Sequence, residues 1–358
     1  MPWSPKIDWL IVGLVLLIFS FGSLILFSLD PQFFRSQLIY FLLGTLLFII
    51  FSSLDYRVFK DFYPHLFIFS IFFLCLTFIL GQLTRGTIRW IKIGNFTLQP
   101  SELVKPMLVL SFSGFALNLD TEKIKNFFLL LLIFFLPAFL VFKQPALGSS
   151  LIVFLTWLGI LVAKGIDKKY ILIGLFLFLA VLPLIWHFLK PYQQERIVSF
   201  INPGYDPLGS GYNLAQAKIA IGSGQFLGKG LGQGSQSQLH FLPERHSDFI
   251  FACLAEEMGF IGGTVVIGAF LALILKIIQL GQKSVEGFGS LICYGTAAMI
   301  FSQVFVNIGM NLGLLPVTGI TLPLVSYGGS SLMSTLILLG FIESISKNIQ
   351  KEKMIEIR

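Results

Sequence analysis

The stretch WLIVGLVLLIFSFGSLILFSL (residues 9–29) contains no charged residue. A helix can cross the hydrocarbon core of a bilayer when about 20 consecutive residues are mostly apolar, and this run has that length. It is too long for the core of a signal peptide, and it lacks a small-residue cleavage site. We therefore expect residues 9–29 to form the first membrane-spanning helix.

The composition of the whole chain agrees with this expectation. Of the 358 residues, 55% are hydrophobic and 12% are charged, and the mean hydropathy is +0.85. A soluble domain of this size needs a much more polar surface. The sequence therefore predicts a single all-α integral membrane domain over residues 1–358 with ten spanning helices. Their expected ranges are about 9–29, 37–54, 62–81, 102–119, 126–143, 146–163, 170–188, 248–276, 287–311 and 325–346.

The distribution of lysine and arginine predicts the orientation. If the N-terminus is cytoplasmic, fourteen of these residues lie at the inner helix ends and five lie in short outer loops. Positive charge accumulates on the cytoplasmic side of membrane proteins, so both termini are expected in the cytoplasm. The long polar segment 189–247 then faces outward, and the helical spacing of YNLAQAKIAIG (212–222) predicts a short interfacial helix within it.

Two other classes of site find no support in the sequence. The net charge of +7 is explained by cytoplasmic loops and an anionic substrate, and no basic and aromatic pattern indicates a nucleic-acid partner. Cys75, Cys253 and Cys293 each lie inside an apolar run, so neither a disulfide framework nor a metal site is expected.

The segment PERHSDFIF (243–251) places Glu244, Arg245, His246 and Asp248 at the mouth of an apolar helix. Aspartate is favoured at a helix N-cap, which is one interpretation of Asp248. The other is a catalytic base at the outer membrane boundary, kept ionised by nearby cations.

Glu256 and Glu257 lie deeper in the same expected helix. Carboxylates inside a membrane are costly and are usually functional or paired. Asp248 and Glu256 are separated by about 12 Å of helix, so they are not expected to act as a carboxylate pair. We expect both glutamates to have structural partners.

A second polar cluster lies in RWIKIGNFTLQPSELVK (89–105). Arg89 and Trp90 fit either an interfacial anchor or a substrate contact. Glu102 and Lys105 are three residues apart and share a helix face. They form either an intrahelical ion pair or a lysine that a carboxylate holds toward a lipid phosphate.

Uncharged polar residues are also expected at outer helix ends, namely Asn307, Asn311 and the segment VSYGGSS (325–331), which includes Ser330. These residues either permit close helix packing or line a pocket for a head group.

Three longer motifs resemble the signatures of a known family. They are QPSELVK (99–105), DPLGSGYNLAQAKIAIGSGQFLGKGLGQGSQSQLHFLPERHSDFIFACLAEEMGFIGG (206–263) and NIGMNLGLLPVTGITLPLVSYGGSS (307–331). Together they resemble the SEDS proteins (shape, elongation, division and sporulation), and the resemblance covers nearly the whole chain. The arginine in FLPERHSDF is more similar to the elongation branch, RodA, than to the division branch, FtsW.

The resemblance implies a peptidoglycan glycosyltransferase in the bacterial cytoplasmic (inner) membrane. Such an enzyme polymerises lipid II at the outer face during cell elongation, with a class B penicillin-binding protein as its partner and membrane lipids around it. The family's catalytic acid corresponds to Asp248 in His246-Ser247-Asp248. Its conserved arginine corresponds to Arg196, and its other motif residues correspond to Glu102, Lys105 and Lys218.

We expect an inverting mechanism, in which Asp248 removes a proton from the acceptor hydroxyl and cations stabilise the departing pyrophosphate. A divalent cation, Mg²⁺ or Mn²⁺, is a candidate for the same task, although no ligand cluster indicates one. The expected substrate-binding residues are Arg196, Lys218, Arg245, His246, Lys105, Glu102, Arg89, Trp90, Gln238 and Ser330.

One residue departs from the family pattern. The family's usual QPDLG reads QPALG here, so Ala146 stands in the place of an aspartate. If that aspartate is catalytic or binds an ion, its loss impairs the chain. If it only caps a helix, its loss costs on the order of 1 kcal/mol. Two alternatives to the polymerase remain: ten spans also fit a flippase or transporter for the lipid-linked precursor, and Ala146 leaves open a non-catalytic scaffold for a penicillin-binding protein.

Overall fold

The computed structural model describes residues 7–84, 87–93, 96–120, 123–144, 146–167, 169–170, 172–174, 176, 186–187, 189–202, 206 and 209–356. Most of the expected seventh span, 170–188, lies outside these residues, as does Pro145, which separates the expected spans 126–143 and 146–163. The side chain of Arg89 also lies outside the described part of the chain.

Eight helices in the described residues are long and apolar enough to cross a membrane. They include α1 (Trp9–Leu29), α2 (Pro31–Ser53), α3 (Phe59–Leu80), α6 (Ile124–Lys143), α7 (Leu147–Lys164), α12 (Ile250–Lys283), α13 (Gly287–Leu312) and α14 (Gly329–Glu356). The expected fourth span is divided into α4 (Pro100–Leu103) and α5 (Lys105–Asn118). A predominantly helical membrane fold is thus confirmed, and the total of ten spans stays a prediction.

Local capping explains where the first helices begin. The side chain of Asp8 accepts a hydrogen bond from the amide of Leu10, so α1 starts where the apolar run starts. Asp30 caps α2 in the same way, and Pro31 occupies its first turn. The predicted start at residue 37 was too late, because apolarity alone does not detect a polar first turn.

A small antiparallel sheet is an addition to the predicted all-α fold. It consists of β1 (Gln82–Thr84), β2 (Thr87–Ile93) and β3 (Phe96–Leu98) in the order β1-β2-β3. The available signal was the content of β-branched and aromatic residues in Thr87–Ile93, which favour strands. The sheet follows α3 and leads into α4, so Trp90 projects from β2 and not from a helix end.

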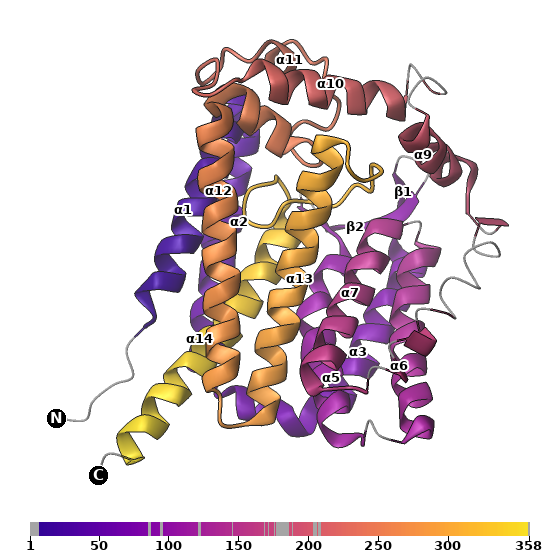
Figure 1. Ribbon diagram of the computed structural model, residues 1–358, viewed down its shortest axis with the longest axis vertical. Coiled ribbons are helices and arrows are strands. Elements are labelled where there is room, and N and C mark those ends of the chain that lie inside the picture. Colours follow the sequence, from indigo (N-terminus) through magenta and orange to yellow (C-terminus); the bar gives the residue numbers. More distant parts are fainter. Residues whose placement is uncertain are drawn as a thin grey trace.

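The long loop folds across one end of the helix bundle. It contains α9 (Pro191–Ile201), α10 (Ser210–Ser223) and α11 (Ser235–Gln238), and α10 confirms the helix predicted at 212–222. Figure 1 shows α10 and α11 lying over the upper end of α12. The first turn of α1 and the last turns of α14 lie at the opposite end, so the two ends of the described chain share one side.

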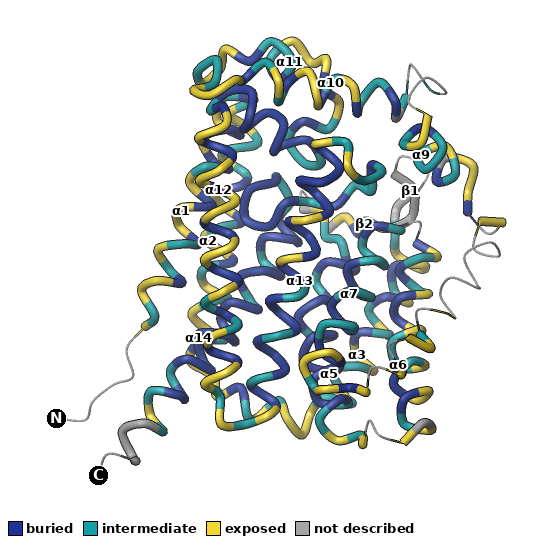
Figure 2. The backbone as a smooth tube through the Cα atoms, viewed as in Figure 1, coloured by how far each residue is buried: buried dark blue, intermediate teal, exposed yellow. Residues whose placement is uncertain are grey.

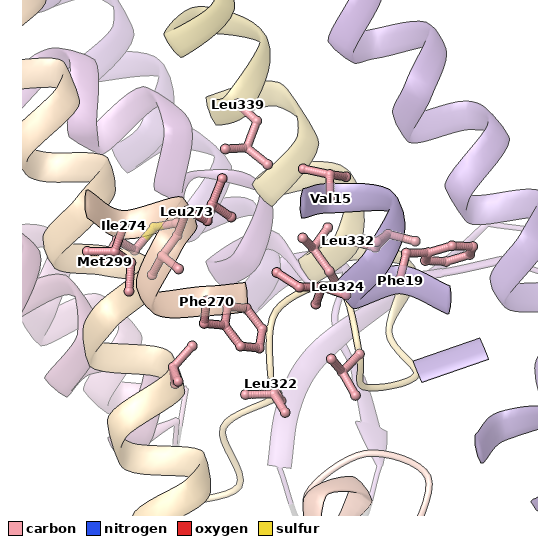
Figure 3. Packing of buried hydrophobic residues seen from close by; sticks show 14 of the residues in the cluster. Val15, Phe19, Phe270, Leu273, Ile274, Met299, Leu322, Leu324, Leu332 and Leu339 are labelled. Carbon is pink, nitrogen blue, oxygen red and sulfur yellow. The ribbon is translucent and has the colours of Figure 1, made fainter. Parts of the chain in front are cut away.

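The core is centred on α13 and α14. In the apolar part of α14, 89% of residues are buried, against 22% in α2, whose outer face is exposed. Figure 2 shows this contrast between the dark central helices and the yellow outer faces. In Figure 3, side chains of α1, α12, α13 and α14 meet the segment between α13 and α14. The labelled members are Val15, Phe19, Phe270, Leu273, Ile274, Met299, Leu322, Leu324, Leu332 and Leu339.

One close approach fixes α1 against that segment. A Cβ atom added at Gly22 would lie 2.6 Å from both the Cα and the carbonyl oxygen of Val325. Backbone cannot move aside as a flexible side chain can, so glycine is required at this contact. The turn at residues 322–327 is therefore held by α1 as well as by its own hydrogen bonds.

We expect Gly22→Ala to lower the free energy of unfolding by about 1–3 kcal/mol, because overpacking strains a filled core. Gly13→Ala is the matched control, since Gly13 lies in the same helix with nothing within 4 Å of its Cβ position. The control is expected to be neutral or stabilising, as alanine favours helix over glycine. Thermal unfolding of both variants in detergent measures the difference, and equal midpoints would contradict this account of the contact.

Candidate active site

Asp248 is not the N-cap of α12. The helix begins at Ile250, and its N-cap is Phe249, which makes no side-chain capping bond. The carbonyl of Glu244 accepts from the amides of Ser247, Asp248 and Phe249 at 3.1, 3.1 and 3.3 Å. In this tight turn the backbone leads into the helix, and Phe249, not Asp248, occupies the N-cap position.

Two buried asparagines of α13 hold the backbone of Asp248. The side-chain amides of Asn307 and Asn311 donate to the Asp248 carbonyl at 3.1 and 3.0 Å. Asn311 also accepts from the amide of Ala252 at 3.1 Å, and both asparagines have no exposed surface. The asparagines therefore fix the position of Asp248, a role that sequence reasoning missed.

Gly319 lies where Asp248 and Arg196 approach each other. A Cβ atom at Gly319 would be 3.3 Å from Oδ2 of Asp248 and 3.8 Å from Nη1 of Arg196. Arg196, from α9, also donates to the carbonyl of Val317 at 3.2 Å. A nearby guanidinium favours the ionised form of a carboxylate. Three segments that are far apart in the sequence thus bring one half-buried carboxylate and one cation together.

His246 is held between two aromatic side chains. Its ring stacks on Phe33 of α2 at a centroid distance of 4.3 Å and meets Tyr327 edge-on at 5.7 Å. Its carbonyl accepts from the amide of Tyr327 at 2.8 Å, and the hydroxyl of Ser326 donates to the carbonyl of Ser247 at 2.6 Å. The segment before Asp248 is thereby joined to the turn before α14.

Lys218 projects from α10 onto the C-terminal end of α13. Its Nζ lies 2.6 Å from the position that a Cβ atom of Gly313, the C-cap of α13, would occupy. The C-terminus of a helix carries partial negative charge, which favours a cation there. Lys218 is exposed, and it lies at the same end of the bundle as Asp248, because Asn311, two residues before Gly313, donates to the Asp248 carbonyl.

Arg245 and Gln238 stabilise the loop between α10 and α12. The Arg245 guanidinium donates to the carbonyls of Ser237 and Gln238, and its Nη2 lies 2.9 Å from the ring of His240. The amide of Gln238 donates to Glu257 at 2.9 Å and to the carbonyl of Ser28 at 3.1 Å. Both side chains are engaged with protein groups.

The two membrane glutamates have structural partners, as predicted. The carboxylate of Glu256 has no exposed surface and accepts from the amides of Gln236 and Ser237, each at 2.9 Å. It also pairs with Lys229 at 3.0 Å. Glu257 accepts from the hydroxyl of Ser28 at 2.6 Å. These bonds connect the segment that carries α10 and α11 to α12, and they connect α12 to α1.

Glu102 and Lys105 form a buried ion pair. The ammonium of Lys105 lies 2.6 and 2.7 Å from the two carboxylate oxygens of Glu102, and neither residue is more than 6% exposed. The amide preceding α4, that of Gln99, donates to the hydroxyl of Ser330 in α14 at 2.9 Å. Trp90 is half-buried on β2.

Ala146 is the N-cap of α7 and provides no side-chain capping bond. An aspartate at such a position accepts a hydrogen bond from the first turn of a helix. The placement of Ala146 therefore favours the capping explanation of the family's usual aspartate.

The residues around Asp248 do not fit a divalent cation. Among the described residues, no group of three or more His, Cys, Asp and Glu side chains gathers in a way that would hold a metal ion. Within 4 Å of a Cβ atom at Gly319 lie a carboxylate oxygen of Asp248 and a guanidinium nitrogen of Arg196, and a guanidinium is not a metal ligand. The described side chains therefore offer no recognisable set of ligands for Mg²⁺ or Mn²⁺.

Comparisons with known proteins extend over nearly the whole chain. Peptidoglycan glycosyltransferase MrdB of Escherichia coli K12 is 37% identical over 342 residues, covering 94% of this chain and 92% of that protein. The probable peptidoglycan glycosyltransferase FtsW of Geobacter sp. M18 is 33% identical over 363 residues, covering 96% and 97%.

Solved structures agree with the sequence comparison. A chain of a peptidoglycan synthase complex, described as coordinating polymerization and crosslinking, superposes with a TM-score of 0.85 at 31% identity, covering 96% of this chain and 98% of that one. The rod shape determining protein RodA of Thermus thermophilus superposes with a TM-score of 0.73 at 28% identity, covering 96% and 97%. The model of the FtsW/RodA/SpoVE family, described as cell cycle proteins, matches residues 6–351, and the chain belongs to this family.

Proposed function

We propose that this chain is a peptidoglycan glycosyltransferase that polymerises lipid II into β-1,4-linked glycan strands during cell elongation. The observation that carries the proposal is the approach of the Asp248 carboxylate and the Arg196 guanidinium around Gly319. The relatives MrdB and FtsW are both named as peptidoglycan glycosyltransferases, FtsW as a probable one, and these names support the class of reaction.

Asp248 acts as the general base. Lipid II bears its sugar in an α linkage to pyrophosphate, and the product linkage is β, so a single in-line displacement accounts for the inversion. The carboxylate takes the proton of the acceptor's 4-hydroxyl as that oxygen attacks the donor's anomeric carbon. The bond from this carbon to the pyrophosphate oxygen breaks, and the pyrophosphate departs with the bonding electrons.

Arg196 stabilises the departing pyrophosphate. A guanidinium binds phosphate oxygens in a bidentate manner, and its position next to Gly319 places it beside the base. Lys218 is the second phosphate ligand in the proposal, since it lies exposed on the same side of the bundle. Arg245 and Lys105 are engaged with loop carbonyls and with Glu102, so we assign them to positioning.

The end of the bundle that carries α10 and α11 faces outward in this proposal. Both termini then lie in the cytoplasm, in agreement with the distribution of lysine and arginine. A substrate with its tail in the bilayer and its sugars outside meets Asp248 at this boundary. A class B penicillin-binding protein is the proposed partner, because the structural relative belongs to a complex that couples polymerization with crosslinking.

Asp248→Asn is expected to lower the rate of glycan polymerisation by about 100-fold or more, since it removes the base and retains the shape of the side chain. Purified protein, with and without its partner, is given labelled lipid II, and the strands are resolved on gels. Glu195→Gln is the control, because it removes an exposed carboxylate next to Arg196 and is expected to change the rate by about twofold at most.

Equal polymerisation by the parent and by Asp248→Asn would remove Asp248 as the base. Transport of lipid II across vesicle membranes without glycan product would favour the flippase. If the partner alone produced as many glycan strands as the partner together with this chain, the result would favour the scaffold.

Gly319→Ala is expected to slow polymerisation by about 10- to 100-fold, because its methyl group would separate the base from the cation, and small displacements of catalytic groups have effects of this size. Gly165→Ala is the matched control. Both glycines have positive φ, +72° and +84°, but a Cβ atom at Gly165 meets nothing within 4 Å.

Both variants are expected to lose about 1–2 kcal/mol of stability from the left-handed backbone. Only Gly319→Ala should lose activity, as measured by initial rates on lipid II. A parallel loss of activity in Gly165→Ala would show that general destabilisation, and not separation of the two groups, explains the effect.

A further inference from the structure

A polar cavity of about 230 Å³ lies at the end of the bundle opposite α10 and α11, where α2 ends against α14. It is separated from the first turn of α14 by about 27 Å of helix, so it is remote from Asp248. Its walls are formed by Ser52, Ser53, Leu54, Asp55, Ser344, Lys347, Asn348 and Lys351.

The two lysines in the wall have different surroundings. The ammonium of Lys347 donates to the carbonyl of Ser52 at 3.0 Å, in the last turn of α2. A cation stabilises a helix C-terminus, which accounts for Lys347 on structural grounds. Lys351 lies one turn later on the same face of α14, is exposed, and has no ion-pair partner among the residues that the structure describes. Helix capping does not account for this second cation.

The acidic groups nearby are engaged with other partners. Asp55 accepts from the amide of Arg57 at 3.0 Å and lies 3.4 Å from the side-chain amide of Asn348. Glu286 pairs with the Arg57 guanidinium at 3.1 Å, and Glu352 pairs with it too. Within the wall, two ammonium groups therefore face one carboxylate, and the cavity has a net positive charge.

An apolar strip of α2 leads to the mouth of the cavity. Leu42, Leu46 and Ile49 follow one another at helical spacing and are 69%, 54% and 56% exposed. In a bilayer this exposed face contacts acyl chains. The strip ends at Ser53 and Leu54, which line the cavity, so an apolar track and a cationic polar recess adjoin each other.

We propose that this cavity binds the phosphate group of an anionic glycerophospholipid, with the acyl chains lying along the α2 strip. Lys347 and Lys351 attract the phosphate, since clusters of cationic side chains between helix ends recognise anionic head groups. A free phosphate ion has the same group but lacks the chains. Under the topology proposed above the lipid belongs to the inner leaflet, and binding does not depend on the glycosyl transfer reaction.

The test compares ligands and variants of the full chain by native mass spectrometry in detergent. The probes are dioctanoyl-phosphatidylglycerol, dioctanoyl-phosphatidylcholine and inorganic phosphate. We expect phosphatidylglycerol to bind best. Lys351→Gln should weaken its binding by about fivefold, and Lys347→Gln combined with Lys351→Gln should weaken it further. Lys283→Gln is the control, because it removes an exposed lysine from the same end of the bundle, outside the cavity wall.

Unchanged binding in Lys283→Gln together with weakened binding in Lys351→Gln supports the site. The single variant keeps the test decisive if loss of the Lys347 cap prevents folding of the double variant. Equal effects of Lys351→Gln and Lys283→Gln would overturn the site, as would equal binding of the two lipids. Binding of inorganic phosphate as tight as that of phosphatidylglycerol would overturn the assignment to a lipid.

Discussion

The amide groups of Asn307 and Asn311 both donate to one carbonyl oxygen, that of Asp248, and the arrangement of the end of the bundle that carries α10 and α11 depends on these two bonds. Buried amides without partners are costly, so the pair holds the backbone strongly. Because the asparagines lie on α13, which is largely buried, the position of Asp248 is set by the rigid core. The Asp248 carboxylate approaches the Arg196 guanidinium next to Gly319.

The carboxylates at this end of the bundle therefore have two distinct environments. Glu256 and Glu257 are buried. They accept hydrogen bonds from amides and hydroxyls, and Glu256 pairs with Lys229, so the two carboxylates stabilise the packing of residues 229–238 and of α1 against α12. Asp248 is half-buried and precedes Phe249, the N-cap residue of α12. The catalytic role that we propose for Asp248 requires a side chain that is held in place and yet open to substrate, and fixing the residue through its backbone carbonyl is compatible with both.

The apolar pattern predicted much of the fold, because a membrane-spanning helix can be recognised from one continuous apolar segment of the chain. Residues 9–29 and the helix at 212–222 were expected and are present. The contacts around Asp248 were not, since they join positions far apart in sequence, such as Arg196 and Val317. The sequence indicated which residues carry charge, and family resemblance suggested Asp248 and Arg196. The left-handed backbone of Gly319 and its place beside Asp248 and Arg196 depend on the packing of three separate segments, which the sequence does not show.

The most direct test of the central claim is a structure of the Asp248→Asn variant with lipid II bound. Our account predicts that the diphosphate lies within hydrogen-bonding distance of Arg196 and that an acceptor 4-hydroxyl lies within about 3 Å of residue 248. A sugar bound away from this position, with the side chain of residue 248 facing only protein, would contradict the account.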